Sequence, residues 1–321
     1  MQSTTTKKTA SKGFKISARV TLPINTGKVN PAYVPRSIEF LDNKKTVEQV
    51  GIAVAHAMPV LLIGETGTGK TSLVRHIASK TGNAFVRVNH NGGTCVEDLV
   101  GRWIISSAGV TEWVDGILIE AMKNGYYFLA DELNAASADI NFVYHSLLDD
   151  DGRVVLVDKG NEVVIPHPNF RFFGAINPPA EYAGTKELNK ALLSRFVVVR
   201  VDFPAPKTEI AVLVERTGIA QNIAEVMVKC AVDLRKSHAS GQLRFVLSTR
   251  DLLQWAVMFQ VYGRMMLSAE STVLNKAGED DLSAVKSRLE MDCVGMDAQL
   301  AQAVTVDASS TSVITAQNDA E

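Results

Sequence analysis

The sequence predicts an α/β fold, in which a parallel sheet is sandwiched by helices and followed by a smaller helical domain. Five short apolar runs, rich in β-branched or aromatic residues, recur between helical or loop stretches: Val60–Ile63, Phe85–Val88, Tyr126–Ala130, Phe170–Ile176 and Phe196–Val201. Runs that are apolar along their whole length suit strands covered on both faces, as in a parallel sheet. Two pairs of β-rich segments lie between these runs, and the pattern changes to helical spacing after Pro204.

Length and composition limit the class of protein. The chain has 321 residues, of which 46% are hydrophobic and 21% charged, with a formal net charge of −2. These values are typical of one large globular domain with an appendage, or of two domains, and they exclude a wholly disordered or collagenous chain. The apolar runs are much shorter than the roughly 20 residues that span a bilayer, so we expect no membrane span. The N-terminus is rich in Thr and Lys without an apolar core, which predicts a cytoplasmic protein.

Composition also suggests four parts of the chain. Residues 1–36 are polar and contain Pro23, Pro31 and Pro35, which predicts an extended N-terminal arm without a core. We expect the α/β domain over 37–203, a helical domain over 204–294 and a mobile tail over 295–321. The first 19 residues carry five basic and no acidic side chains, whereas residues 270–321 hold ten acids and three bases. The basic arm is therefore a candidate for contact with nucleic acid, and the alternative is that both ends are simply solvated.

The two β-rich pairs predict hairpins inserted into the α/β domain. In the first, Trp103–Ser106 and Val110–Val114 flank a turn that contains Gly109. In the second, Arg153–Val157 and Glu162–Ile165 flank Asp158-Lys159-Gly160-Asn161, a strong turn sequence. Beyond Pro206, amphipathic spacing predicts helices over Ile210–Val214, Ile223–Val232 and Leu252–Val261.

A glycine-rich segment follows the first predicted strand and fits the pattern G-x-x-x-x-G-K-S/T at every position. Glycines there let backbone N–H groups curl around phosphate oxygens, and the N-terminus of the following helix favours anionic charge. Lys70 would reach the β- and γ-phosphates, and the Thr71 hydroxyl would ligate Mg²⁺. The candidate nucleotide-binding residues are Gly64, Glu65, Thr66, Gly67, Thr68, Gly69, Lys70, Thr71 and Ser72.

Two later strands end in polar residues suited to nucleotide hydrolysis. Asp131 and Glu132 close the run that begins at Tyr126, and Asn177 follows Phe170–Ile176. Asp131 would hold Mg²⁺ through its water shell, Glu132 would orient or polarise the attacking water, and the Asn177 amide would hold that water or the γ-phosphate. Taken alone, acids at a strand end are often helix caps, and Asn before Pro178 is a common start of a turn.

This combination resembles the AAA+ ATPases, a class of P-loop NTPase. The resemblance rests on the order of the glycine-rich loop (Walker A), the Asp131-Glu132 pair (Walker B), the strand that ends in Asn177, and the segments Ala191–Phe196 and Ser248–Asp251. The two hairpins are similar to those of the MoxR, McrB and dynein-related branch. The phrases Thr111-Glu112-Trp113 and Ile165-Pro166-His167-Pro168 look closest to MoxR-type and cobaltochelatase-small-subunit-type proteins. The resemblance covers roughly residues 40–290.

The resemblance implies a mechanism and partners. It implies catalytic roles for Glu132, for Asn177 as sensor 1, for Arg195 as an arginine finger that reaches a neighbouring subunit, and for Arg250 as sensor 2. It implies ATP and Mg²⁺ as cofactors and a homo-oligomeric, hexameric ring that remodels a protein client. The resemblance implies a protein client or a co-factor protein of the von Willebrand A type as the partner, and it favours such a protein over a nucleic acid. Trp103 and Trp113 either face such a client or are buried against the sheet.

Two other functions remain open from the sequence. One is a nucleic-acid-associated motor like McrB, which shares both hairpins and uses GTP. The other is a nucleotide-locked ring that acts as a scaffold. The presence of Lys70, Asp131, Glu132 and Asn177 argues against the second, because a catalytically inactive relative usually lacks such residues.

Overall fold

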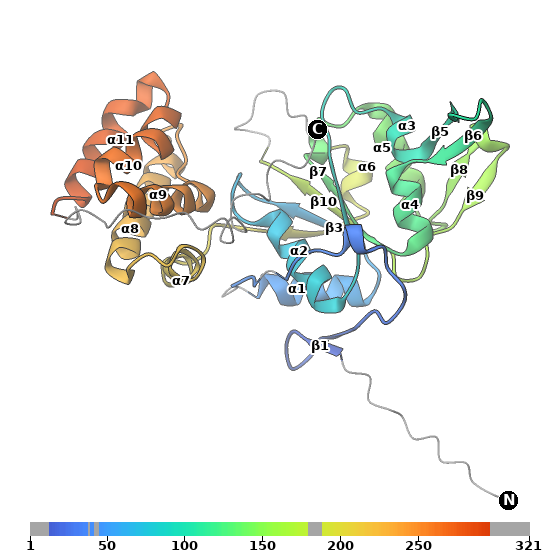
Figure 1. Cartoon of the computed structure of the whole chain (residues 1–321), viewed down its shortest axis with the longest axis horizontal. Helices are drawn as coiled ribbons and strands as arrows, with labels where there is room; N and C mark the ends of the chain where they lie inside the picture. The colour runs from blue at the N-terminus through green and yellow to red at the C-terminus, as the bar shows by residue number, and fades with distance from the viewer. Residues whose placement is uncertain (1–12, 38, 42–44, 179–187, 296–321) are drawn as a thin grey trace, which may run out of the picture. The chain divides into compact units, whose positions relative to one another are not determined.

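Figure 1 shows the fold of the chain, taken from a computed structural model. The structure describes residues 13–37, 39–41, 45–178 and 188–295, so the predicted tail lies outside it apart from residue 295. The chain divides into two compact units. The first runs to Asp202 without Thr66–Thr68, and the second contains those three residues and the chain from Phe203 onward. Within the described ranges, no helix is long and apolar enough to cross a membrane.

Five parallel strands form the central sheet of the first unit, in the order β11-β3-β10-β7-β4. Each of the five apolar runs forms one strand, and the strand ends lie within one residue of those expected. The bounds are Val60–Ile63 (β3), Phe85–Asn89 (β4), Tyr127–Asp131 (β7), Arg171–Ile176 (β10) and Val197–Arg200 (β11). The order places β10 between β3 and β7, so the carboxyl ends of these three strands are neighbours.

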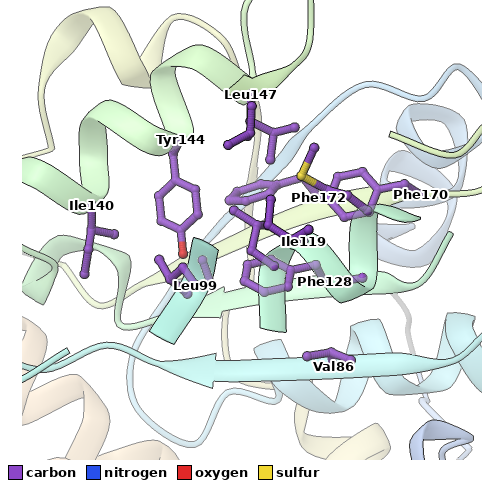
Figure 2. Close-up of a cluster of buried hydrophobic side chains, with 14 of the residues drawn as sticks. Val86, Leu99, Ile119, Phe128, Ile140, Tyr144, Leu147, Phe170 and Phe172 are labelled. Carbon is purple, nitrogen blue, oxygen red and sulfur yellow. The ribbon is translucent and has the colours of Figure 1, made fainter. Parts of the chain in front are cut away.

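Helices cover both faces of this sheet, which confirms the α/β prediction (Figure 1). Because side chains alternate along a strand, Leu61 and Phe128 enter one apolar cluster while Leu62 and Leu129 enter another. The second cluster is completed by α1 (Thr46–Ala55) and α2 (Lys70–Thr81). Figure 2 shows the first cluster, with Tyr144 beside the sheet residues Phe128 and Phe172. Its helices are α3 (Val96–Val100), α4 (Ile117–Asn124) and α5 (Ala138–Leu147).

Both predicted hairpins are present, and they lie side by side (Figure 1). The Trp103 indole N–H on the first hairpin donates to the Asp158 carbonyl on the second, at 3.0 Å. Trp103 stays about half exposed, at 51%, whereas Trp113 packs against the core, so the two tryptophans differ in their environment. The hairpin strands are β5 (Gly101–Ile105), β6 (Thr111–Asp115), β8 (Val154–Leu156) and β9 (Glu162–Val164). Short helical turns are η2 (Leu133–Ala135), η3 (Val157–Lys159) and α6 (Lys190–Leu193).

The expectation that residues 1–36 contribute no core is wrong for part of this arm. β1 (Gly13–Lys15) and β2 (Thr21–Pro23) pair as a small antiparallel hairpin, followed by the turn η1 (Pro31–Tyr33). Val20 and Leu22 are buried in the cluster of α1 and α2. Pro23 ends β2 and Pro31 begins η1, so the prolines do not prevent these short elements. A proline at the end of an edge strand costs no ladder hydrogen bond inside the sheet. Residues 1–12 of the arm lie outside the described residues.

The second unit is helical, as predicted from the spacing beyond Pro206. Its core surrounds the fully buried Trp255, whose indole N–H donates to the Ser268 hydroxyl at 3.0 Å. Two helices were not predicted, because the faces that they bury carry few large apolar side chains: Met265, Ser268, Ala269 and Thr272 in α10, and Asp281, Val285 and Leu289 in α11. The elements are α7 (Pro206–Thr217), α8 (Gln221–Ala239), α9 (Thr249–Tyr262), α10 (Met265–Thr272), η4 (Leu274–Lys276) and α11 (Glu279–Asp292).

A buried ion pair connects three of these helices. The Arg235 guanidinium donates to both carboxylate oxygens of Glu209, each at 2.8 Å, and to the Leu247 carbonyl at 2.8 Å. The Thr249 hydroxyl donates to the same carboxylate at 2.5 Å, and Arg235 stacks on Phe203 at 3.8 Å. The Glu209 side chain is fully buried, so its charge depends on these donors.

Replacing Arg235 by alanine is expected to destabilise the second unit by about 3–5 kcal/mol, because it leaves the Glu209 carboxylate buried without a counter-charge. Urea unfolding of the full chain, followed by circular dichroism, measures this loss. The matched control is Lys236→Ala, one residue along the same helix, because Lys236 is exposed and its ion pair with Asp233 faces solvent. Equal effects of the two substitutions would contradict a structural role for the buried pair.

Candidate active site

The glycine-rich loop connects β3, in the middle of the sheet, to α2. Gly67 and Gly69 have φ of +80° and +95°, in the region that a side chain disfavours, so glycine is required at both positions. Gly69 is the N-terminal cap of α2, and Lys70, Thr71 and Ser72 form its first turn. The free N–H groups at a helix N-terminus attract anions, so this loop can bind the phosphates of a nucleotide.

Lys70 is buried at the centre of the site. Its ammonium group donates to the carbonyl oxygens of Gly64 and Glu65, at 2.6 and 3.0 Å, and to the Asn177 Oδ1 at 2.8 Å. A buried ammonium needs such oxygen partners, because the loss of its water shell is costly. The geometry therefore holds one positive charge beside the loop that would carry the phosphates.

The two acids at the end of β7 face this lysine and the start of α2. Asp131 Oδ2 accepts from the Thr71 hydroxyl at 3.1 Å and from Arg87 Nε at 2.8 Å. Glu132 has a left-handed backbone with φ of +54°, and its two carboxylate oxygens lie 3.2 and 3.3 Å from Asn177 Nδ2. Asn177 therefore joins Lys70 to Glu132, which is possible because β10 lies between β3 and β7.

The donor set beside the loop suits a magnesium ion. Asp131 and Thr71 supply a carboxylate and a hydroxyl oxygen, and Mg²⁺ prefers oxygen ligands while keeping several waters or phosphate oxygens. Among the described residues, no group of three or more His, Cys, Asp or Glu side chains could hold a metal ion by itself. A magnesium ion at this site would therefore depend on the nucleotide for part of its coordination.

Two residues that contact Asp131, Arg87 and His90, were not predicted from the sequence to belong to this site. Arg87 in β4 pairs with Asp131, and the signal for it was a charged residue inside an otherwise apolar strand. His90 follows the same strand, and its backbone N–H donates to the Asp131 carbonyl at 2.9 Å. Burial lowers the pKa of His90 to about 4, against a smaller opposing effect of the Asp131 charge. Its ring is therefore neutral near pH 7, and its Nε2 lies 2.8 Å from the Tyr144 hydroxyl.

The structure places the two predicted arginines differently with respect to the loop. Arg195 makes no contact with the loop within the described residues, whereas Arg250 lies beside Gly67, where an added Cβ would be 3.7 Å from the Arg250 Cβ. Arg195 lies two residues after α6. Its guanidinium donates to the Ala191 carbonyl at 2.6 Å and to the Asp149 carboxylate at 3.3 Å. Within the described residues, none of these contacts involves Lys70 or Glu132. Arg250 lies in the second unit, in the first turn of α9, which a Ser248–Asp251 capping box begins. The roles of Arg195 and Arg250 stay predictions.

Two known protein families match this chain, one over the α/β domain and one over the helical domain. Residues 59–196 match the AAA domain of the dynein-related subfamily, and residues 209–289 match the C-terminal domain of CbbQ, NirQ and NorQ proteins. The protein CbbQ of Hydrogenophilus thermoluteolus is 34% identical over 195 residues, which are 61% of this chain and 71% of that protein. The chain belongs to the MoxR-like AAA+ ATPases.

Other relatives of this AAA+ ATPase differ greatly in length. Subunit CobS of the aerobic cobaltochelatase of a Sinorhizobium species is 29% identical over 264 residues, which are 77% of this chain and 79% of CobS. Midasin of Dictyostelium discoideum is 33% identical over 238 residues, which are 72% of this chain but 4% of midasin. The match to the AAA domain confirms the resemblance inferred from the motifs, and the matched residues 59–196 include Lys70, Asp131, Glu132 and Asn177.

Replacing Lys70 by alanine in this AAA+ ATPase is expected to abolish tight nucleotide binding, because it removes the buried positive charge beside the phosphate loop while the loop backbone remains. Titration of a fluorescent ATP analogue measures the affinity. Lys80→Ala is the matched control, since Lys80 lies in the last turn of the same helix and pairs with Glu39. Unchanged affinity in Lys70→Ala would show that the loop does not bind the phosphates.

Proposed function

We propose that this AAA+ ATPase assembles in the cytoplasm into a homo-hexameric ring, in which Mg²⁺-dependent ATP hydrolysis at each subunit interface changes the conformation of a protein partner. One observation carries the proposal. Lys70, Asn177 and Glu132 form a continuous hydrogen-bonded set, while the predicted finger Arg195 makes its described contacts elsewhere in its own subunit. A site in which the phosphate-binding and water-activating residues are together but the arginine finger is missing is completed when a neighbouring subunit supplies the arginine.

Each residue has a role in this proposal. The loop Gly64–Gly69 and Lys70 bind the phosphates, and Thr71 and Asp131 hold Mg²⁺, which neutralises charge on the phosphates when bound. Glu132 accepts a proton from the attacking water, and Asn177 keeps the Glu132 carboxylate in place by its amide hydrogen bonds. Arg195 of one copy and Arg250 of the second unit stabilise charge on the transferring phosphoryl group.

A partner protein is supported by the relatives and by the hairpins. CobS is named as one subunit of a cobaltochelatase, so that relative works with other proteins. In this chain, the paired hairpins expose Trp103, Ile105 at 77% and Ile165 at 71%, and exposed apolar groups of this size are frequent at protein–protein contacts. We therefore propose a protein client, with a von Willebrand A-type partner as the first to test.

The proposal is tested on the unmodified chain. Mass photometry with ATP and Mg²⁺ is expected to show a hexamer, and the rate of phosphate release per subunit is expected to rise with protein concentration. EDTA is expected to abolish hydrolysis. A monomer with a concentration-independent rate would contradict the ring, and salt-sensitive binding to DNA in place of a protein client would favour the McrB-like alternative.

A further inference from the structure

The first unit carries a basic cluster formed by Arg36, Arg75 and Arg87, in which Arg87 pairs with Asp131. Arg87 Nε and the Thr71 hydroxyl both donate to Asp131 Oδ2, at 2.8 and 3.1 Å. Arg75 lies one helical turn after Thr71 on α2 and thus on the same face of that helix. Partial burial and the positive charges of Arg87 and Arg36 lower the pKa of Arg75, which agrees with their closeness. Among the described residues, Arg75 and Arg36 have no acidic partner.

An acidic segment of opposite charge accompanies Arg195. Asp149, Asp150 and Asp151 follow α5 in sequence, and all three are exposed. Asp149 contacts the Arg195 guanidinium at 3.3 Å, and Asp151 pairs with Arg153 at 3.0 Å. The Arg195 Nε is buried without a hydrogen-bond partner, so its present contacts leave the guanidinium only partly satisfied. If Arg195 leaves Asp149, the segment keeps two carboxylates without a counter-charge.

We propose that these two surfaces meet in a head-to-tail contact between copies of this chain, with Asp149–Asp151 of one copy against Arg36 and Arg75 of the next. This inference rests on the ring in the proposed function and identifies the contact that builds it. A head-to-tail interface joins two different surfaces of one chain, so each chain must carry both halves of a complementary pair. The acidic half contains Asp149, which contacts Arg195, and the basic half belongs to the same cluster as Arg87, which pairs with Asp131 of the acceptor site.

The contact also explains how Arg195 is released. In a free subunit, Asp149 holds the Arg195 guanidinium. When the basic cluster of the neighbouring copy approaches, Asp149 exchanges Arg195 for that cluster, and Arg195 becomes free to reach the neighbour's phosphates. Opposite charges across an interface also steer the two copies into register, and they do so less well as salt increases.

Charge reversal tests the contact with four forms of the full chain. The acidic face is reversed in Asp150→Arg/Asp151→Arg, the basic face in Arg36→Glu/Arg75→Glu, and both in the quadruple variant. The control Asp280→Arg/Glu290→Arg has the same net charge as the first variant and alters exposed acids of α11. Asp149, Arg87 and Arg195 are kept, because they touch the site or the finger. Circular dichroism and fluorescent-ATP titration establish that each variant folds and binds nucleotide.

Sedimentation velocity at low salt, with Mg²⁺ and a slowly hydrolysed ATP analogue, measures assembly. Each double variant is expected to need at least about tenfold more protein than the wild type for half-assembly. The quadruple variant is expected to assemble again, and so is an equimolar mixture of the two double variants, since alternating copies then place opposite charges at every contact.

Three results would overturn the inference. If the double variants assemble like the wild type, the proposed contact is wrong, but the ring itself is not contradicted. Loss of nucleotide affinity in Arg36→Glu/Arg75→Glu would assign the basic cluster to the nucleotide. A wild-type chain that stays monomeric with nucleotide would overturn both the ring and this contact.

Discussion

Replacing Glu132 by glutamine is expected to leave ATP binding intact and to slow hydrolysis by a factor on the order of 10²–10⁴, the usual contribution of a general base. In the wild type, Asn177 Nδ2 lies 3.2 and 3.3 Å from the two Glu132 carboxylate oxygens. Glutamine has the same shape as glutamate, and its amide oxygen can still accept a hydrogen bond from Asn177 Nδ2. An amide, however, cannot accept the proton of the attacking water. Phosphate release measures the turnover, and titration of a fluorescent ATP analogue measures the affinity.

The control for this substitution is Glu120→Gln in α4. Glu120 belongs to the same unit, and its carboxylate accepts a weak hydrogen bond from the Tyr33 hydroxyl at 3.4 Å, away from the phosphate loop. We expect both its turnover and its affinity to match the wild type. Wild-type turnover in Glu132→Gln would mean that another group activates the water, and loss of ATP affinity would mean that the carboxylate acts mainly in binding.

The central sheet was predictable because its strands are covered on both faces. Such strands are apolar along most of their length, and the runs Val60–Ile63 and Tyr126–Ala130 show this directly in the sequence. The order of the strands carries no such local signal. Asn177 lies 107 residues from Lys70 and 45 from Glu132, and its position between them depends on β10 inserting between β3 and β7. Motif order predicted which residues act, whereas the hydrogen bonds among them could be seen only in the structure.

The parts that sequence reasoning missed have physical reasons of their own. Val20 and Leu22 look too few to form a core, and they are buried only because α1 and α2 present an apolar surface to them. The helix α10 buries Ser268 and Thr272, whose hydroxyls donate to main-chain carbonyls, so its buried face has no apolar stripe. Arg87 is visible in the sequence as a charged residue between Val86 and Val88 of its strand. Its pairing with Asp131 depends on the neighbouring strand β7, which the sequence does not place.

Arg195→Ala is expected to bind nucleotide with unchanged affinity and to lose hydrolysis by a factor on the order of 10³, the lower range for an arginine finger. Affinity should persist because the described contacts of Arg195 are with Ala191 and Asp149, not with the loop or Lys70 of its own subunit. Arg200→Ala is the matched control, since Arg200 is an exposed arginine at the end of β11, close in sequence to Arg195. A cis-acting Arg195 would also lower turnover, so this variant alone does not separate the two mechanisms.

Mixing two inactive variants separates them. In rings that contain equal numbers of Arg195→Ala and Glu132→Gln subunits, about one quarter of the head-to-tail interfaces join an intact Glu132 site to an intact Arg195 of the next copy. If Arg195 acts across the interface, about a quarter of the wild-type rate should therefore return on mixing, whereas a cis mechanism leaves every subunit with one defect. Native mass spectrometry establishes that the rings are mixed. Mixed rings without activity would assign Arg195 to its own subunit, where its contact with Asp149 would then be structural, and hydrolysis would no longer require a neighbour.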